Sequence, residues 1–184
     1  MQKISKFIYH RLLGWSFGGF DQFSSVKKAV IIAAPHTSWH DFYIGVLLRS
    51  IIQIEANFVG KESLFNPITG WFFKALGGAP IKRNGNENQV DAIARLFNNR
   101  LIFRMVLAPE GTRKKVKEFK SGFYHIAHNA QVPIFPVAFD FENKKMIFHS
   151  LFYTTGNREK DILQIEAIFE GVKGRIPKNS FFKD

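Results

Sequence analysis

The 184-residue sequence contains no cysteine. This absence excludes a disulfide framework, a thiolate nucleophile and a metal site with cysteine ligands. It is compatible with a cytoplasmic protein, because disulfides are rare in that compartment. The length is that of one domain, which can bury its own core without the help of metals or cross-links.

Long apolar runs are also missing. No stretch approaches the roughly 18–20 apolar residues that a membrane-spanning helix needs, so we expect no transmembrane span. The longest run near the start, residues 12–20, is interrupted by three glycines. It carries no small-residue cleavage site, which makes it a poor signal peptide.

Acidic residues are scarce: 15 Asp and Glu stand against 26 Lys and Arg, which gives a net charge of +11. Such a chain is attracted to nucleic acid, anionic lipid headgroups or small phosphorylated substrates. The basic residues are spread along the sequence without a zinc-finger, helix-turn-helix or RNP signature. We therefore expect an anionic membrane surface as a partner and no nucleic acid. A basic module that binds nucleic acid or lipid without catalysis is an alternative.

The chain begins with a basic amphipathic segment, residues 1–23. Its apolar side chains share one stripe of a helix: Ile4, Phe7, Ile8, Leu12 and Leu13. Such a helix can lie in a membrane interface with its apolar face down, or it can pack on the protein's own core. Residues 24–184 are then the main domain, which we expect at the cytoplasmic face of the cell membrane as a peripheral protein.

The rest of the chain alternates short apolar runs with segments of helical periodicity. The strand candidates are residues 26–35, 56–59, 79–82, 101–107, 133–139 and 144–152. The helix candidates are residues 38–52 (with Ser38 as N-cap), 67–76, 87–98, 121–130 and 159–171. This alternation predicts a single α/β domain with a mixed, largely parallel sheet flanked by helices. In such sheets functional side chains gather past the carboxyl ends of strands.

Two polar clusters follow strand candidates, and the first contains His36 and Asp41. A histidine whose pKa lies near neutrality can take the proton of a hydroxyl that attacks an acyl carbonyl. A carboxylate on its other ring nitrogen fixes the tautomer and stabilises the imidazolium that forms. The structural alternative is that His36 caps a helix while Asp41 favours its first turn.

The second cluster, Glu110-Gly111-Thr112-Arg113, suits phosphate binding. Glycine permits close backbone approach to a ligand. The threonine hydroxyl and backbone N–H groups can donate hydrogen bonds, and the guanidinium offers a forked contact to phosphate oxygens. The alternative for Arg113 is a solvated loop, since it opens the basic run 113–117. Glu110 has the wrong charge for a phosphate ligand, so we expect it to orient a basic side chain or a loop amide.

Aromatic residues are abundant, with 21 phenylalanines. Trp71, Phe72 and Phe73 follow one another in a short helix candidate, where such residues ordinarily belong to the core. An acyl chain also needs a long apolar surface, worth about 0.8 kcal/mol per buried CH₂. These three side chains can therefore equally wall an acyl groove or touch a bilayer. The histidines His125 and His128 have no third ligand at a helpful spacing, so we expect no metal site.

Four blocks follow one another in a definite order. They are residues 35–41 (Pro-His-Thr-Ser-Trp-His-Asp), 78–83 (Gly-Ala-Pro-Ile-Lys-Arg), 109–113 (Pro-Glu-Gly-Thr-Arg) and 132–137 (Val-Pro-Ile-Phe-Pro-Val). A lysine-led stretch, residues 61–65, stands before the second block. Together they resemble the glycerolipid acyltransferases of the lysophosphatidate acyltransferase (PlsC-type) family, whose hallmark is His, four residues, Asp. The ordered combination is far more specific than any single spacing.

The resemblance implies transfer of a fatty acyl group from acyl-CoA or acyl-carrier protein to a hydroxyl of a lyso-phospholipid, foremost 1-acyl-glycerol-3-phosphate. A lyso-aminolipid acceptor is the alternative. The implied catalytic residues are His36, as general base, and Asp41, which orients it. The implied substrate-binding residues are Arg83, Gly111, Thr112, Arg113, Glu110 and Lys61. No bound cofactor is expected, since the acyl donor is a co-substrate.

Overall fold

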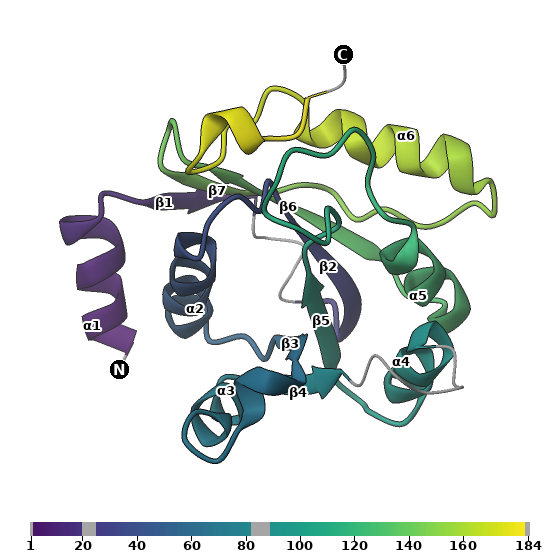
Figure 1. Ribbon diagram of the computed structural model, residues 1–184, viewed down its shortest axis with the longest axis horizontal. Helices are drawn as coiled ribbons and strands as arrows, with labels where there is room; N and C mark the ends of the chain where they lie inside the picture. The colour runs from purple at the N-terminus through teal and green to yellow at the C-terminus, as the bar shows by residue number, and fades with distance from the viewer. Residues whose placement is uncertain (1, 20–24, 82–88, 183–184) are drawn as a thin grey trace.

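The computed structural model describes residues 2–19, 25–81 and 89–182, which form a seven-stranded sheet with helices on both faces (Figure 1). The strands are β1 (Ser16–Gly18), β2 (Lys28–Ala34), β3 (Asn57–Lys61), β4 (Gly78–Ile81), β5 (Phe103–Leu107), β6 (Ile134–Asp140) and β7 (Lys145–Phe148). Their order in the sheet is β1-β7-β6-β2-β5-β3-β4. Strands β2 to β6 are parallel, whereas β7 is antiparallel to β6 and β1 is parallel to β7. The predicted mixed, largely parallel α/β fold is confirmed.

The helices fall where helical periodicity places them, with bounds that differ by up to three residues at either end. The α-helices are α1 (Gln2–Lys6), α2 (His40–Ile52), α3 (Gly70–Ala75), α4 (Gln89–Asn98), α5 (Gly122–Ala130) and α6 (Arg158–Phe169). The π-helix is η1 (Phe7–Leu12), and the 3-10 segments are η2 (Glu62–Phe65) and η3 (Pro177–Asn179). In α6 the Asn157 side chain accepts the N–H of Lys160 at 3.2 Å, an N-cap contact. No helix in the described part of the chain is both long and apolar enough to cross a membrane.

Two apolar clusters cover the two faces of the sheet, and β2 contributes to both. Val30, Ile32 and Ala34 belong to the cluster under α4, α5 and α6. Ala29 and Ile31 belong to the cluster under the N-terminal helix and α2. This division follows from the alternation of side chains along a strand. Because both faces are covered, β2 is apolar at nearly every position, as buried parallel strands are.

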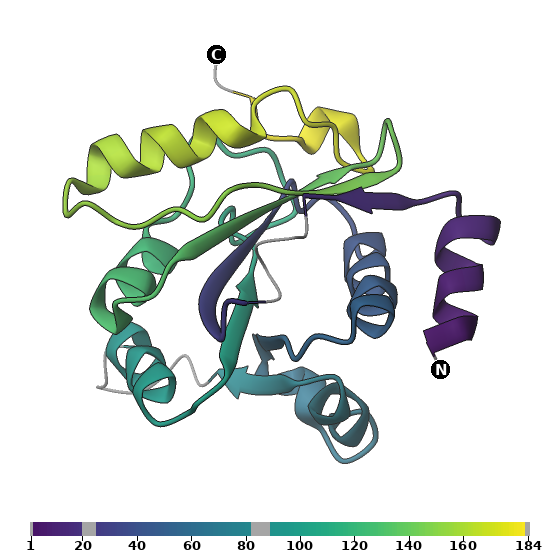
Figure 2. The ribbon, with the colours of Figure 1, turned by 180° about the vertical axis from the view of Figure 1, so that it is seen from behind.

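The N-terminal helix, which α1 and η1 form together, packs one of its sides on α2 and lies away from α4 and α5 (Figure 2). The Gln2 amide donates to the carbonyl of Ile51 at 2.8 Å, and the hydroxyls of Ser5 and Ser50 lie 2.9 Å apart. The exposed apolar residues of this helix are Ile4, Phe7 and Leu12. The two alternatives for this segment are therefore compatible: one side of the helix packs on the protein, and the other side exposes apolar residues.

The edge strand β1 has no counterpart among the strand candidates. It is three residues long, and glycine follows it directly. A period-two pattern cannot be recognised over so few residues. Its formation depends on pairing with β7, which lies far away in the sequence. The N-terminal segment thus contributes both a helix and a strand to the domain.

Candidate active site

The two polar clusters, residues 36–41 and 110–113, meet at one edge of the sheet. β2 and β5 are neighbouring parallel strands, with Ile32 opposite Leu107. Both strands therefore end at the same edge, and the loops that follow them leave the sheet side by side. The topology brings together the two groups of residues that the sequence motifs single out.

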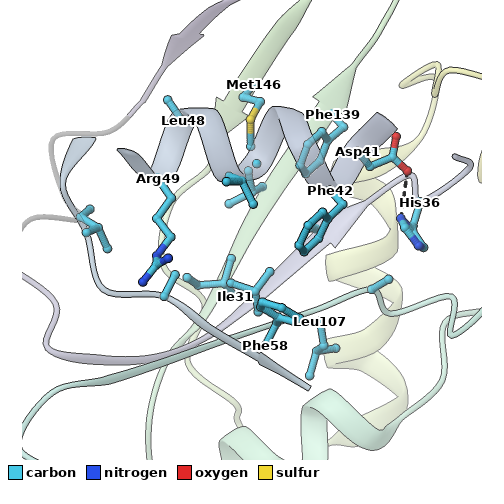
Figure 3. Close-up of a pocket in the computed structure, with 18 of the residues that line it drawn as sticks. Ile31, His36, Asp41, Phe42, Leu48, Arg49, Phe58, Leu107, Phe139 and Met146 are labelled. Carbon is cyan, nitrogen blue, oxygen red and sulfur yellow. Dashed lines mark ion pairs between the residues drawn. The ribbon is translucent and has the colours of Figure 1, made fainter. Parts of the chain in front are cut away.

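The His36 ring is held by Asp41 (Figure 3). Nδ1 of the ring lies 2.9 Å from Asp41 Oδ2, and the same oxygen accepts the backbone N–H groups of Thr37 and Ser38, each at 3.0 Å. The Asp41 side chain is 5% exposed and that of His36 is 27% exposed. Three donors thus orient a buried carboxylate. The carboxylate in turn holds a proton on Nδ1 and leaves the lone pair on Nε2, where a base needs it.

Ser38, the expected N-cap of α2, lies one residue ahead of the N-cap in the structure, although its hydroxyl accepts the N–H of His40 at 3.3 Å. The helix begins at His40, and the preceding residue, Trp39, makes no side-chain cap. Ser38 donates its backbone N–H to Asp41 Oδ2. The carboxylate in the first turn therefore collects the loop amides ahead of the helix, and this is what pins the His36 loop to α2.

Glu110 supports the His36 loop from the second cluster. Its side chain is 2% exposed, and Oε1 accepts the backbone N–H of His36 at 2.7 Å. Oε2 is buried and has no hydrogen-bond partner among the described residues. Burial raises the pKa of Glu110 to about 7, against the lowering effect of the His36 N–H. Glu110 therefore holds a loop amide, and through it the backbone that carries the candidate base.

The pKa of Glu110 predicts how stability depends on pH. A carboxyl group whose pKa is raised on folding binds more protons in the folded state, so its contribution is present at low pH and is lost as the pH rises toward and past 7. We expect the free energy of unfolding of Glu110→Gln, relative to the wild type, to increase by about 2–3 kcal/mol between pH 5 and pH 8. Urea unfolding across this range measures the difference. The exposed Glu118→Gln is the control, and parallel curves for wild type and Glu110→Gln would contradict the prediction.

Arg113 brings a guanidinium to the open side of the His36 ring. Its Nε–H donates to His36 Nε2 at 3.4 Å. The loop turns at Gly111, where φ is +63°, a conformation that glycine adopts without strain. The Thr112 hydroxyl accepts the N–H of Lys114 at 3.3 Å and so orders the next residues. The second cluster therefore presents a cation directly beside the candidate base.

Lys120 adds a second positive charge that the motifs do not reveal. Its backbone N–H donates to the carbonyl of Pro109 at 2.9 Å, which folds the loop back on itself. Its side chain lies so close to Gly111 that a β-carbon there would be 3.0–3.2 Å away. One lysine among several in a basic stretch has no distinguishing spacing. Only the closed loop shows that this one adjoins the glycine.

Residues 174–180 brace both site loops from the far end of the chain. Thr37 Oγ1 accepts the N–H of Ile176 at 3.1 Å. The Asn179 amide donates to the carbonyl of Arg113 at 2.9 Å. These contacts join segments that are more than 60 positions apart in sequence, so no local pattern could have indicated them.

Two of the implied substrate-binding residues are not placed by this geometry. Arg83 lies outside the described residues. Lys61 is the last residue of β3, which pairs with β5, so its backbone belongs to the edge of the sheet that carries the site. Its side chain lies outside the described part of the chain. The roles of both residues stay predictions.

An apolar cavity of about 320 Å³ lies between α2 and the sheet and reaches His36 and Asp41. Its wall combines side chains from α2, from β2 and from strands on either side of β2, including Ile31, Phe42, Phe58, Leu107, Phe139 and Met146 (Figure 3). A long apolar group inside this cavity would gain from burial along its length. A reactive group at the end of such a chain would face His36.

The aromatic residues of α3 divide between the core and the surface. The ring of Phe73 packs on Phe42 and Phe58, with centroids 6.1 Å and 6.5 Å apart, and so backs the cavity wall. Trp71 is 70% exposed and Phe72 is also exposed. Only Phe73 thus stands close to the cavity, and the other two side chains face outward.

The histidines of α5 take part in other contacts. His128 Nδ1 lies 3.0 Å from Thr154 Oγ1, and its ring stacks on Tyr124 with centroids 5.8 Å apart. Within the described residues, no group of three or more histidine, aspartate or glutamate side chains is arranged to hold a metal ion. We assign these histidines no part in the site.

Known proteins resemble this chain in sequence and in fold. The chain is 30% identical over 126 residues to the chloroplastic 1-acyl-sn-glycerol-3-phosphate acyltransferase BAT2 of Brassica napus, covering 65% of this chain and 35% of the relative. It is 31% identical over 127 residues to the 1-acyl-sn-glycerol-3-phosphate acyltransferase of Escherichia coli K12, covering 66% and 51%. The chain thus spans about a third to a half of these relatives' length.

The crystal structure of the 1-acyl-sn-glycerophosphate (LPA) acyltransferase PlsC from Thermotoga maritima has the same fold. It superposes with a TM-score of 0.64 at 19% identity, covering 91% of this chain and 76% of that one. The sequence model of the family described as Acyltransferase matches residues 18–140, a range that contains both polar clusters. The resemblance drawn from the four blocks is confirmed, and the chain belongs to the acyltransferase family.

Proposed function

We propose that this protein transfers a fatty acyl group from a thioester, acyl-CoA or acyl-carrier protein, to the free hydroxyl of 1-acyl-glycerol-3-phosphate. The observation that carries the proposal is the placement of His36 Nε2 between the apolar cavity and Arg113. An apolar chain and a phosphate can be held on the two sides of one base. The names of the relatives from Brassica napus and Escherichia coli support the choice of acceptor.

The His36/Asp41 pair supplies the proton transfers of this reaction. Nε2 takes the proton of the acceptor hydroxyl as its oxygen attacks the thioester carbonyl, and Asp41 stabilises the imidazolium that results. The C–O bond forms and the C–S bond breaks. The proton on Nε2 then passes to the departing thiolate. The products are an ester and a free thiol, and no covalent acyl-enzyme or resident cofactor takes part.

The loop of Gly111, Thr112 and Arg113 supplies the acceptor's phosphate site, with Lys120 as a second cation. Arg113 Nε–H donates to His36 Nε2, which ties up the lone pair that catalysis needs. A phosphate is the better acceptor for a guanidinium, because both partners are charged. Phosphate binding therefore draws Arg113 off the ring and frees the base. We assign Arg83 and Lys61 to the same phosphate on the strength of the family blocks.

The cavity between α2 and the sheet holds the acyl chain of the donor. Each methylene buried along its apolar wall contributes about 0.8 kcal/mol to binding. The thioester carbonyl then lies at the end of the cavity where His36 and Asp41 stand. Positioning of both reactants beside one base can lower the barrier by several kcal/mol.

We place the protein peripherally on the anionic, cytoplasmic face of a membrane. Exposed apolar residues on the N-terminal helix stand beside the exposed cations Lys3 and Lys6. A second exposed group, on η2, α3 and the turn between them, contains Ile68, which is 81% exposed, and Trp71. Exposed apolar side chains suit insertion among anionic headgroups, and neighbouring lysines such as those of the N-terminal helix add attraction to the headgroup charge.

Replacing one apolar residue in each group by glutamate is expected to weaken binding to anionic vesicles. Phe7→Glu and Trp71→Glu each remove an inserting side chain and add a charge of the wrong sign, so we expect at least a tenfold loss of partitioning. Sedimentation with vesicles of phosphatidylglycerol and phosphatidylcholine measures this. Leu101→Glu, at an 89% exposed position before β5, is the matched control. Equal partitioning of all three variants and the wild type would show that neither group contacts the membrane.

A product screen by mass spectrometry tests the reaction itself. The purified protein is offered acyl-CoA and acyl-carrier protein donors against lysophosphatidate, other lyso-phospholipids and lyso-aminolipids. Phosphatidate should be the main product. Preferred acylation of a lyso-aminolipid would instead show that the acceptor lacks the phosphate to which we assign Arg113. Absence of transfer to every acceptor would refute the proposal.

A further inference from the structure

The apolar cavity has a polar group at its far end. Among the described residues that line it, only His36, Asp41 and Arg49 carry polar side chains. Figure 3 shows the first two at one end and Arg49 at the other. Arg49 follows Asp41 by eight residues on α2, which corresponds to about 12 Å along the helix axis. The side chains between these ends offer no hydrogen-bonding group.

The Arg49 side chain has an unused donor inside the protein. Its Nε–H is buried and lacks a hydrogen-bond partner among the described residues. Nη2 lies near Gly77, where a β-carbon would be 3.6 Å away. The position of Arg49 in the last turn of α2 accounts for a positive charge there, since cations are favourable near helix C-termini. It does not account for a buried donor beside a cavity, because native structures rarely leave one unpaired.

Resting on the proposed acyl transfer, we propose that Arg49 selects the acyl chain by its far end. A chain that carries a hydroxyl oxygen at this depth can accept the Nε–H. A methyl group in the same place leaves the donor unpaired and keeps water from a charged group, which is unfavourable. Arg49 is therefore a specificity residue that favours an oxygen-bearing chain end over a methyl end of equal length.

The test compares matched donors in matched variants. Saturated acyl thioesters from octanoyl to stearoyl and their ω-hydroxy counterparts are assayed with lysophosphatidate, using whichever carrier the wild type accepts. We expect the ratio of kcat/KM for the ω-hydroxy over the saturated donor to reach a maximum at one chain length. At that length the ratio should fall at least tenfold in Arg49→Met and Arg49→Leu, which keep an apolar wall and remove the donors. Arg158→Met, at an exposed position on α6, should behave as the wild type.

An unchanged ratio at every chain length would overturn the proposal. So would a variant that only extends the range of saturated chains, because Arg49 would then be a steric stop and not an oxygen-binding group. Thermal unfolding of each variant separates loss of fold from loss of selectivity.

A binding measurement on the wild type tests the proposal even if the Arg49 variants do not fold or no turnover is detected. A fluorescent fatty acid probe in the cavity is displaced by saturated and ω-hydroxy fatty acids of increasing length. The hydroxyl should weaken displacement by short chains, since it then lies among apolar side chains, and strengthen it at one greater length. Weakening at every length overturns the proposal. This binding measurement does not depend on turnover. If no acyl transfer were observed, the proposed function would be refuted, but the displacement data would still test the role of Arg49.

Discussion

Replacing His36 by alanine is expected to lower kcat by about 10²–10⁴-fold, the range that a positioned general base contributes. The KM values for acceptor and donor should change little, because the cavity and the Arg113 loop stay in place. The expectation rests on the geometry of one nitrogen. Asp41 holds the proton of the ring on Nδ1 at 2.9 Å, so Nε2 carries the lone pair where the cavity ends. Steady-state rates with saturating donor and lysophosphatidate measure the loss.

Two companion variants sharpen the result. In Asp41→Asn the amide oxygen can still accept the N–H groups of Thr37 and Ser38, which keeps the ring in place but removes the charge that stabilises the imidazolium. Its kcat should therefore lie between those of the wild type and His36→Ala. His40→Ala changes the first residue of α2, a histidine whose Nδ1 contacts Ser38 Oγ at 2.8 Å, and its rate should stay within a few-fold of the wild type. Near-normal turnover of His36→Ala would contradict the general-base mechanism.

Replacing Arg113 by alanine is expected to raise the KM for lysophosphatidate by about 10–100-fold, since a hydrogen bond to a charged group contributes about 1.5–3 kcal/mol. The effect should be specific to the phosphate. An acceptor that has a hydroxyl but no phosphate never engages the guanidinium, so its KM should not change. Its kcat should not fall either, because the variant removes the donor that occupies His36 Nε2.

Lys117→Ala is the control for the loss of positive charge from this loop. Lys117 is exposed, as is Arg113, and no role is assigned to it. Initial rates over a range of acceptor concentrations, with and without the phosphate, separate the two effects. If Arg113→Ala left the KM for lysophosphatidate unchanged, the phosphate would be bound elsewhere. Equal losses in Arg113→Ala and Lys117→Ala would indicate attraction by net charge and not a specific contact.

Most of the fold follows from patterns that are visible in the sequence. β2 is recognisable because burial on both faces makes it apolar at nearly every position. α2 is recognisable because its buried residues Ile44, Leu48 and Ile51 recur at helical spacing. β1 is not recognisable, since its three residues become a strand only by pairing with β7. α2 begins two residues after Ser38, but the Ser38 hydroxyl accepts the N–H of His40 and its backbone N–H donates to Asp41, which are contacts typical of a helix start.

The site divides in the same way between local and distant contacts. His36, Asp41 and the Glu110 cluster lie in short contiguous motifs, and two neighbouring parallel strands bring them together. Asn179 reaches the site through the return of a distant segment, which no spacing encodes. Arg49 is an intermediate case. At 3.6 residues per turn, it lies about 80° around α2 from Asp41, so helical periodicity could have placed it on the face that carries the carboxylate.

α2 therefore fixes the relative direction of the side chains at the two ends of the cavity. Asp41 stands in its first turn and Arg49 in its last, and the helix between them is uninterrupted. An insertion of one residue within this helix would leave Asp41 beside His36 but rotate everything beyond it by about 100°. Chain selection would be lost while the base stayed intact. The spacing of eight positions between Asp41 and Arg49 thus fixes how the two ends of the cavity face each other in this chain.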